Sequence, residues 1–396
     1  MSDPWLTIVG LGEDGPVGLS EASHAALTAA RIIFGGPRHL DLVGAGPRGR
    51  AWPVPFSIDP ILAEKPMGGV VVVTSGDPFW YGAGGSLSQV LSPEEWIAHP
   101  APSTFAHAAA RMGWRVEDTI CIGLHAASFE RLRPDLTNGQ RFICLLRDGS
   151  APAQLAKWLT TQGFGTSTLT VLEALAGPRE RVRAMGAESF DLADVSTPVA
   201  VALLATGPKG LPQSNGLPDD IFASDGQITK SPIRALTLAA LAPRAGEVLW
   251  DLGAGSGSIS VEWCLSAARA TAHAIEARAD RVRNITQNAR NFGLDYRLSV
   301  HEARWQDGLA GLPQPDAVFV GGGVDSAGLE TLWQALPVGA RLVVNAVTLE
   351  SEALLMQSHQ TRGGELFRFD VARAMPIGRM QGWTPSRPVV QWSVTR

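Results

Sequence analysis

Cysteine is scarce in this sequence, which limits the stabilising bonds and the metal chemistry open to it. Among 396 residues there are three cysteines, with no Cys-x-x-Cys pair and no Cys/His cluster of metal-ligand spacing. We therefore expect neither a disulfide framework nor a protein-bound metal. Cys121, Cys144 and Cys264 are expected to be reduced, buried and apolar in character, which is typical of a cytoplasmic protein.

Long hydrophobic runs are missing as well. The longest, around Val70–Val73, is far shorter than the roughly 20 apolar residues that a membrane-spanning helix needs. The opening residues MSDPW lack the basic region and the apolar run of a signal peptide. We therefore expect a soluble chain with no membrane partner.

Positive charge is not in surplus, since 33 Lys and Arg face 38 Asp and Glu and the net charge is −5. This net negative charge gives no overall attraction to nucleic acid. The sequence also has no basic stripe interleaved with aromatic residues, which disfavours an RNA substrate. An anionic small molecule would need a local cluster of Arg and Lys. Hydrophobic residues at 45%, with 43 glycines and 27 prolines, indicate a loop-rich globular α/β protein.

The length of the chain favours two domains of about 200 residues each. The segment 206–218 is dense in Gly, Pro, Ser and Asn, and it follows an apolar, strand-like run. We expect this segment to link a first domain at 1–205 to a second domain at 219–396. No tandem repeat of solenoid period is present in the sequence.

Strands alternate with helices in the second half, which predicts a parallel sheet covered on both faces. Two late strand-like runs, 365–372 and 388–394, could form a closing hairpin. The first half has strand patterns at 6–10, 70–74 and 141–146 between glycine-rich turns, which favours two small α/β lobes. In the second half the other expected strands are 247–251, 271–276, 297–302, 316–320 and 341–347, and the expected helices are 258–268 and 279–292, the latter capped by Gly293.

A glycine loop, DLGAGSG at 251–257, lies where the first of these strands meets a helix. Glycines let the backbone approach a ligand closely, and the start of a helix offers free N–H groups. Asp251 would repel a pyrophosphate but suits the ammonium of a methionine tail, and Glu276, 25 residues on, can accept both hydroxyls of a ribose. The loop is typical of the first motif of class I S-adenosylmethionine methyltransferases, and the alternative is a purely structural turn.

The absence of one loop from the second half narrows the range of possible substrates. Enzymes that methylate exocyclic amines often carry an [Asn/Asp]-Pro-Pro-aromatic loop, which is missing after the strand at 316–320. The segment that takes its place ends in Gly321–Gly323, and glycines leave space for a large flat molecule near the sulfonium. A nucleic-acid base is therefore disfavoured as the substrate.

Two sets of motifs resemble known families, one set in each half. The second-half set resembles the decarboxylating precorrin methyltransferases of cobalamin biosynthesis, and the first-half set resembles the class III tetrapyrrole methylases. The second-half motifs are TKSPIR at 229–234, the glycine loop, NITQN at 284–288 and DAVFVGGG at 316–323. The first-half motifs are VGLG at 9–12, TSGDP at 74–78, YGAG at 81–84, PST at 102–104 and LH at 124–125.

The first half departs from the class III pattern at two places. The usual Gly-x-Gly-Pro-Gly-Asp loop here contains Glu13, and the usual Pro-Gly before the serine motif appears as Pro100–Ala101. These departures put the detailed roles of the loops in question more than the resemblance itself. They leave open the alternative that one domain acts only as a binding or docking module.

The resemblance spans nearly the whole chain and carries implications for fold and function. It implies a two-lobed tetrapyrrole methylase fold followed by a Rossmann-like class I methyltransferase with a mostly parallel, seven-stranded sheet. The implied reaction is methylation of precorrin-6B at C-5 and C-15, with loss of carbon dioxide from the ring C acetate, to give precorrin-8. In the family the C-terminal domain is associated with C-15 and decarboxylation, and the N-terminal domain with C-5.

The same resemblance implies one S-adenosylmethionine in each domain and no metal. It also implies a homo-oligomer, at least a dimer, formed through the N-terminal domain. Another tetrapyrrole remains an alternative substrate.

Candidate site residues follow from these motifs, and acidic ring substituents call for Arg and Lys. Lys230, Arg234 and His125 are candidate catalytic residues, with surface cations and a structural histidine as the alternatives. Trp383 is a candidate for stacking on the substrate. The candidate cofactor residues are Ser75, Gly76, Asp77, Pro78, Ser103, Thr104, Asp251, Gly253, Gly255, Gly257, Glu276 and Ala303. The candidate substrate residues are Gly10, Gly12, Thr229, Lys230, Arg234, Gly321, Gly322, Arg379 and Arg387.

Overall fold

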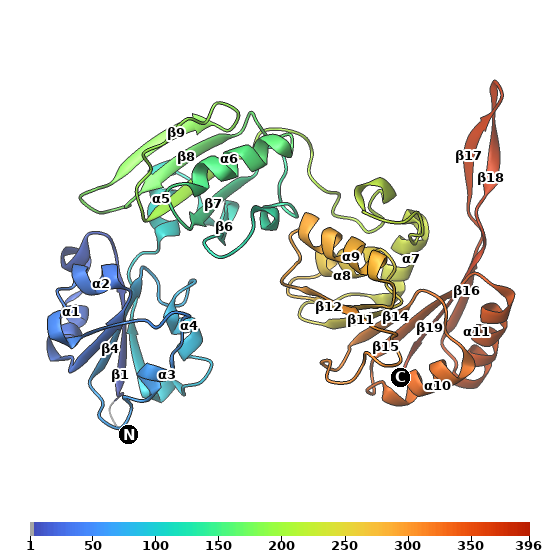
Figure 1. Ribbon diagram of the computed structural model, residues 1–396, viewed down its shortest axis with the longest axis horizontal. Helices are drawn as coiled ribbons and strands as arrows, with labels where there is room; N and C mark the ends of the chain where they lie inside the picture. Colours follow the sequence, from blue (N-terminus) through green and yellow to red (C-terminus); the bar gives the residue numbers. More distant parts are fainter. Residues whose placement is uncertain (1–3) are drawn as a thin grey trace. The chain divides into compact units, whose positions relative to one another are not determined.

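The computed structural model describes residues 4–396, which form two compact α/β units (Figure 1). The first unit comprises Met1–Phe129 and Thr137–Lys209, and the second comprises Glu130–Leu136 and Gly210–Arg396. The first three residues of the segment MSDPW lie outside the described residues. No helix within residues 4–396 is long and apolar enough to cross a membrane. The boundaries expected at 205 and 219 stay a prediction.

The first lobe of the first unit is a parallel sheet with the strand order β3-β2-β4-β1-β5. Its central strands β1 and β4 are almost wholly buried, as expected for parallel strands that are covered on both faces. The strands are β1 Leu6–Leu11, β2 Ile32–Gly35, β3 Gly49–Ala51, β4 Val70–Ser75 and β5 Trp96–His99. The helices are α1 Glu21–Ala29, α2 Pro37–Leu42, α3 Asp59–Leu62 and α4 Ala83–Leu87.

The second lobe of this unit is a mixed sheet with the strand order β6-β7-β10-β8-β9. Strands β6 and β7 are parallel and the other pairs are antiparallel. The Ser103 side chain starts α5 because its Oγ accepts a hydrogen bond from the Ala106 N–H. The elements are α5 Thr104–Met112, β6 Ile120–Gly123, β7 Arg141–Leu146, α6 Ala151–Thr161, β8 Thr168–Glu173, β9 Arg181–Gly186 and β10 Val199–Leu204.

The second unit contains a seven-stranded sheet with the order β13-β12-β11-β14-β15-β19-β16. The first five strands are parallel, and β19 runs antiparallel between β15 and β16. One face packs against α7, α8 and α9, the other against α10 and α11 (Figure 1). The strands are β11 Val248–Leu252, β12 Thr271–Glu276, β13 Leu298–Glu302, β14 Ala317–Val320, β15 Arg341–Ala346, β16 Glu365–Phe369 and β19 Val389–Thr395. The helices are α7 Ser231–Leu241, α8 Ser258–Ser266, α9 Ala279–Asn291, α10 Ser326–Ala335 and α11 Leu349–Arg362.

These layers confirm the fold class expected from the sequence, an α/β fold of two kinds in one chain. The expected pairing of the two late strands also holds, because β16 and β19 are antiparallel neighbours. The sequence did not predict the hairpin between them, formed by β17 Ala372–Ile377 and β18 Met380–Pro385. Nearly all of its residues are exposed, so no alternation of buried and exposed positions marks the strands.

Gly293, after α9, combines a left-handed backbone with a close approach of another segment. Its φ is +65°, and a Cβ atom added to it would lie 2.2 Å from the backbone oxygen of Glu130, which belongs to the same unit. Gly339 has a similar φ of +93°, but a Cβ atom there meets nothing within 4 Å.

Substitution of Gly293 and of Gly339 by alanine gives a matched pair of variants, because only Gly293 is in close contact with another segment. We expect Gly339→Ala to lower the free energy of unfolding of the second unit by about 1 kcal/mol, the backbone cost alone. Gly293→Ala should cost roughly 1–3 kcal/mol more, because the segment that contains Glu130 must move away. Denaturant unfolding followed by tryptophan fluorescence measures both, and equal losses would contradict the packing of this segment against Gly293.

Candidate active sites

The glycine loop of the second unit connects β11 to α8 and has the left-handed backbone that glycine favours. Gly253, Gly255 and Gly257 have φ values of +69°, +62° and +71°. Cβ atoms added to the first two would have their nearest neighbours at 3.9 Å, so open space lies beside them. A Cβ atom on Gly257 would lie 2.7 Å from the side chain of Ile285 on α9. The first two glycines therefore leave room for a ligand, and the third lets the loop pack against α9.

Asp251, at the end of β11, is a buried carboxylate with one unused oxygen. Its Oδ2 accepts a hydrogen bond from Ser260 Oγ at 2.6 Å, whereas Oδ1 is buried and has no hydrogen-bond partner among the described residues. Burial raises the pKa of Asp251 to about 6. A buried carboxylate oxygen without a partner is stabilised by a cation, so this position fits the ammonium of S-adenosylmethionine.

Glu276, at the end of β12, orders the same loop. Its Oε2 accepts from the Gly255 N–H at 2.9 Å, and its Oε1 accepts from the Arg278 N–H at 3.0 Å. Each carboxylate oxygen has a further lone pair, so both can also accept from ribose hydroxyls. Ala303 lies beside it, because the Ala303 N–H donates to the Glu276 carbonyl at 3.1 Å. The structure thus brings the predicted cofactor residues of the second unit together.

The predicted substrate residues Gly321 and Gly322 also border this loop. The Gly321 N–H donates to the Leu252 carbonyl, and the carbonyl oxygen of Gly322 lies 3.9 Å from the Cβ position of Gly253. On another side, the Gln227 carbonyl lies 3.9 Å from the Cβ position of Gly255. The chain before α7 therefore lines the loop as well.

Arg234 is fully buried, which corrects its selection as a candidate catalytic and substrate-binding residue. Its side chain has no exposed surface and forms ion pairs with Glu262 and Asp219. Its guanidinium also donates to the backbone carbonyls of Thr229 and Leu217. Arg234 instead connects the chain before α7 to α8.

Further contacts of the same cluster hold this segment in place. The guanidinium of Arg234 lies 4.8 Å from the centre of the Phe222 ring. The carboxylate of Glu262 accepts from the N–H groups of Gly216 and Leu217, at the end of the predicted linker. The position of the segment that borders the glycine loop therefore depends on this buried charge cluster.

Lys230 precedes α7, and its side chain is largely exposed. Its side chain is 58% exposed, and its Nζ lies 3.8 Å from Asp219. Thr229, next to it, is partly buried and uses its carbonyl for Arg234. Of Thr229, Lys230 and Arg234, Lys230 is the residue whose cationic end is largely exposed, although it pairs with Asp219.

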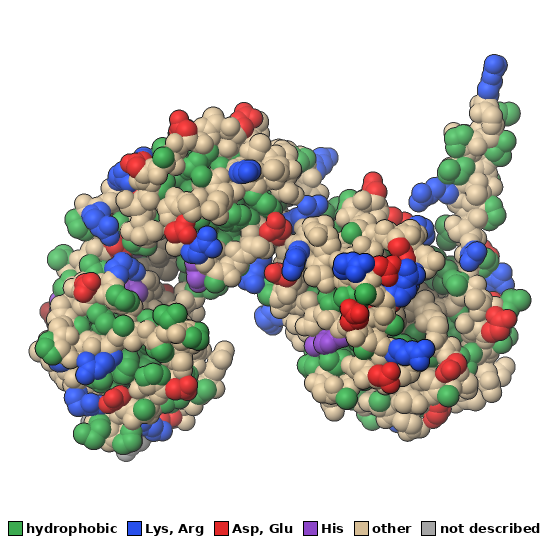
Figure 2. Space-filling model, viewed as in Figure 1, with side chains coloured by type: hydrophobic (Ala, Val, Ile, Leu, Met, Phe, Trp, Pro, Cys, Tyr) green, Lys and Arg blue, Asp and Glu red, His purple; other side chains and the backbone are tan. Residues whose placement is uncertain are grey.

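Arg379 and Arg387 lie on the unpredicted hairpin, Arg379 in the turn between β17 and β18 and Arg387 just after β18. Both are exposed, as is Trp383, which is 76% exposed on β18. Figure 2 shows hydrophobic side chains along the β17–β18 hairpin and a basic side chain at its tip. Contact of these three residues with a substrate stays a prediction.

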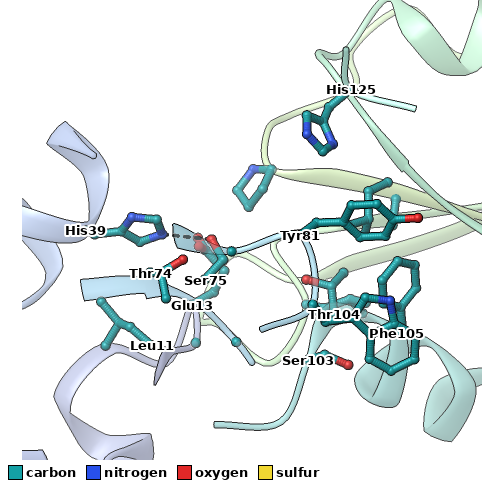
Figure 3. A pocket seen from close by; sticks show the side chains of 18 of the residues that line it. Leu11, Glu13, His39, Thr74, Ser75, Tyr81, Ser103, Thr104, Phe105 and His125 are labelled. Carbon is teal, nitrogen blue, oxygen red and sulfur yellow. Dashed lines mark hydrogen bonds between the residues drawn. The ribbon is translucent and has the colours of Figure 1, made fainter. Parts of the chain in front are cut away.

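The first unit contains a cavity of about 700 Å³ (Figure 3). Its walls include the carboxyl ends of strands β1 and β4, the start of α5 and the loop after β6. Aromatic side chains line much of it, among them Trp52, Phe56, Trp80, Tyr81 and Phe105. The predicted residues that line it are Gly12, Ser75, Gly76, Ser103, Thr104 and His125.

Three predicted residues of this unit shape the loops and are not among those that line the cavity. A Cβ atom on Gly10 would lie 2.0 Å from the Gly76 carbonyl oxygen, so the role predicted for Gly10 against the substrate is corrected to close packing of loops. Asp77 accepts a hydrogen bond from the Phe79 N–H at 2.8 Å, as in a turn. The Pro78 carbonyl fills the space beside Gly82, 2.5 Å from its Cβ position.

A polar cluster on one side of the cavity was not predicted from the sequence. His39 Nε2 lies 2.8 Å from Ser75 Oγ and 2.8 Å from Arg38 Nη2, and Arg38 also forms an ion pair with Glu13. Burial, together with the charge of Arg38, lowers the pKa of His39 to about 4, so the imidazole is neutral. Glu13 is the residue by which the first loop departs from the class III pattern, and here it holds a cation of the site.

His125 lies on the side of the cavity opposite His39, next to Tyr81 (Figure 3). The two rings meet edge to face with their centres 6.3 Å apart. Tyr81 has a φ of +58°, which is a strained conformation for a bulky residue. His125 is exposed, so its imidazole can reach a ligand in the cavity. No cluster of three or more His, Cys, Asp or Glu able to hold a metal occurs among the residues that the structure describes.

Comparison with known proteins gives matches over both units. A family model described as "Tetrapyrrole (Corrin/Porphyrin) Methylases" matches residues 5–191, and one described as "Precorrin methyltransferase domain" matches residues 220–396. A precorrin-6Y C(5,15)-methyltransferase [decarboxylating] from Sinorhizobium sp is 44% identical over 99% of this chain and 97% of its own length. The chain belongs to the precorrin-6Y C(5,15)-methyltransferase (decarboxylating) family. Its members are methyltransferases, and this chain is an S-adenosylmethionine-dependent C-methyltransferase.

Two further proteins with this description are similar to the whole chain or to part of it. The protein of the same description from Mycobacterium tuberculosis is 41% identical over 99% of this chain and 100% of its own length. The solved C-terminal domain of the precorrin-6Y C5,15-methyltransferase of Rhodobacter capsulatus is 55% identical, with a TM-score of 0.46, and covers 47% of this chain and 100% of that chain.

The different burial of Arg234 and Lys230 predicts different effects of their removal. Arg234→Met should lower the free energy of unfolding by about 3–5 kcal/mol, because it leaves Glu262 as an unpaired buried charge. Lys230→Met should change it by less than about 0.5 kcal/mol, since its side chain is largely exposed. Chemical denaturation measures both, and a stable Arg234→Met protein would return Arg234 to the list of candidate ligand-binding residues.

Proposed function

We propose that the chain methylates precorrin-6B at C-5 and C-15 and removes carbon dioxide from the ring C acetate, in cobalamin biosynthesis. The observation that carries this proposal is the match to decarboxylating C(5,15)-methyltransferases over nearly the full length of both chains. Two separate candidate sites, the glycine loop of the second unit and the cavity of the first, support a chain with two activities.

We further propose that the second unit performs C-15 methylation and decarboxylation, and that the first performs C-5 methylation. Relatives described as probable cobalt-precorrin-6B C(15)-methyltransferases (decarboxylating) cover 44% of this chain, which is less than half of it and fits a single unit. Each unit would bind one S-adenosylmethionine. In the second unit Asp251, Glu276 and the first two glycines would hold it, and in the first unit the Ser75–Gly76 loop with Ser103 and Thr104 would do so.

Bound S-adenosylmethionine supplies an electrophilic methyl group. The ring carbon that receives the methyl is already electron-rich, so the protein's main task is to hold it in line with the methyl at near-contact distance. Such orientation can supply roughly 7–11 kcal/mol of the barrier. Replacement of a ring hydrogen by methyl releases one proton, and the imidazole of His125, which is exposed and lines the cavity of the first unit, would accept it.

Decarboxylation leaves an electron pair that the conjugated macrocycle can accept, and a proton must later reach the exocyclic carbon. Lys230 is an exposed cation beside the glycine loop segment and would pair with an acidic ring substituent. The Gly321–Gly322 backbone would leave space for the flat ring. The expected assembly of at least a dimer stays a prediction of the family resemblance.

The first experiment is mass spectrometry of the product after incubation with precorrin-6B and methyl-labelled S-adenosylmethionine. We expect two labelled methyl groups and the loss of carbon dioxide. One labelled methyl with decarboxylation would mean that only the second unit acts on this substrate and would leave the first as a binding module. No change in mass, with the cofactor bound, would overturn the choice of substrate.

Cofactor stoichiometry tests the proposal of one site in each unit. Isothermal titration calorimetry should find two S-adenosylmethionine sites for each chain. Asp251→Asn should weaken one of them about 10- to 100-fold, since a hydrogen-bonded charge pair is worth roughly 1.5–3 kcal/mol, and leave the other unchanged. The control Asp295→Asn, an exposed carboxylate in the same unit, should keep both sites. One site in the unmodified protein would contradict the proposal.

A further inference from the structure

The polar side of the first unit's cavity gathers residues from three neighbouring parallel strands. Glu13 follows β1, Arg38 and His39 follow β2, and Ser75 ends β4. The carboxyl ends of parallel strands lie at the same edge of a sheet, so these four side chains are close together there. All four line the cavity. Of the described residues that line the cavity, Glu13 and Arg38 are the charged ones.

The guanidinium of Arg38 is held in a fixed position. Its Nη2 donates to Ser75 Oγ at 3.0 Å and lies 2.8 Å from His39 Nε2, and its Nη1 pairs with Glu13. A guanidinium only donates hydrogen bonds, so Nε2 is the acceptor and the neutral imidazole carries its proton on Nδ1. Three partners use three of the five N–H groups, which leaves donors for a ligand.

The charges of this cluster do not balance. Glu13 faces two guanidiniums, because Arg179 Nη2 also lies 3.5 Å from its carboxylate. With His39 neutral, one positive charge is in excess. Burial, together with the nearby charge of Arg179, lowers the pKa of Arg38, so its charged form is less favourable here than in water. The Arg38 side chain is 36% exposed, so an anion in the cavity can reach it.

The rest of the wall is suited to a flat conjugated molecule. The Trp52 and Phe56 rings lie 5.2 Å apart, and the Trp80 and Phe105 rings lie 4.7 Å apart. Phe56, Trp80 and Tyr81 remain 51%, 39% and 56% exposed within this lining. A planar ring with acidic substituents matches such a wall with a single fixed cation at one side.

We propose that Arg38, held in place by His39, Ser75 and Glu13, binds a carboxylate side chain of the macrocycle and so fixes the ring in the first unit. His39 is a positioning residue, because it acts through the guanidinium. This inference rests on the proposed function of the first unit. The same chemistry would also bind the carboxylate of the S-adenosylmethionine tail, and the experiment separates the two sources.

The test uses the full chain, in which the second unit serves as an internal control. Arg38→Gln should raise the KM for precorrin-6B in C-5 methylation about 10- to 100-fold, while C-15 methylation and decarboxylation keep their rates. Arg38→Lys should recover part of the loss, because an ammonium retains the charge but not the fork of donors. Arg31→Gln removes an arginine of the same lobe that pairs with Glu64 outside the cavity and should have no effect.

Calorimetry with S-adenosylmethionine separates the two carboxylates. Two sites with unchanged Kd in Arg38→Gln support the macrocycle as the ligand. A 10-fold or larger loss at one site would assign the carboxylate to the cofactor and overturn the proposal. Unchanged KM in Arg38→Gln would also overturn it, whereas absence of C-5 methylation in the unmodified protein would overturn the proposed function instead.

His39 has its own readout. His39→Gln keeps a hydrogen-bond acceptor and should leave the KM within about threefold of the unmodified protein, whereas His39→Phe removes the acceptor and should raise KM with little change in kcat. Loss of kcat alone in His39→Phe would contradict a positioning role.

Discussion

Parallel strand pairing is the constraint on which both candidate sites depend. In the first unit, β1 lies beside β4 and β4 beside β2, so the loops after all three strands leave the sheet at one edge. In the second unit, β11 lies between β12 and β14 and delivers the glycine loop next to Glu276 and Gly321. The residues of each site come from segments far apart in the sequence, and the sheet is what brings them together. A change of strand order would disperse both sites without altering any motif.

Buried charges in the second unit have two different surroundings. In the second unit Arg234 and Glu262 neutralise each other and fasten the chain before α7, so their effect on ligand binding is indirect. Asp251 is left with an unused oxygen and a raised pKa, which is unfavourable in the free protein and becomes favourable when a cation binds. The paired charges therefore stabilise the chain around the candidate site, and the incompletely paired Asp251 is a candidate position for a bound cation.

The Glu13 substitution in the first loop shows how a departure from a family pattern can be absorbed. By sequence alone it put the activity of the N-terminal domain in question. In the structure its carboxylate pairs with Arg38 and Arg179 at the cavity, where a Pro-Gly turn would offer no charge. The loop is thus integrated into the polar side of the cavity, which favours a working site over a vestigial one.

The sequence by itself determined the local features of this protein. The glycine loop, the carboxylates at Asp251 and Glu276, the strands from β11 to β15 and the two family resemblances were all readable, because backbone conformation and burial periodicity depend on neighbouring residues. Whether Arg234 faces solvent, whether Gly10 meets a ligand or a loop, and whether Arg38, His39 and Ser75 meet at all were decided only by the tertiary structure. The exposed hairpin of β17 and β18 was also missed, since it has no buried face to leave a pattern. The reason is common to these cases: burial of a charge and proximity of side chains depend on residues tens of positions away, and local sequence carries no record of them.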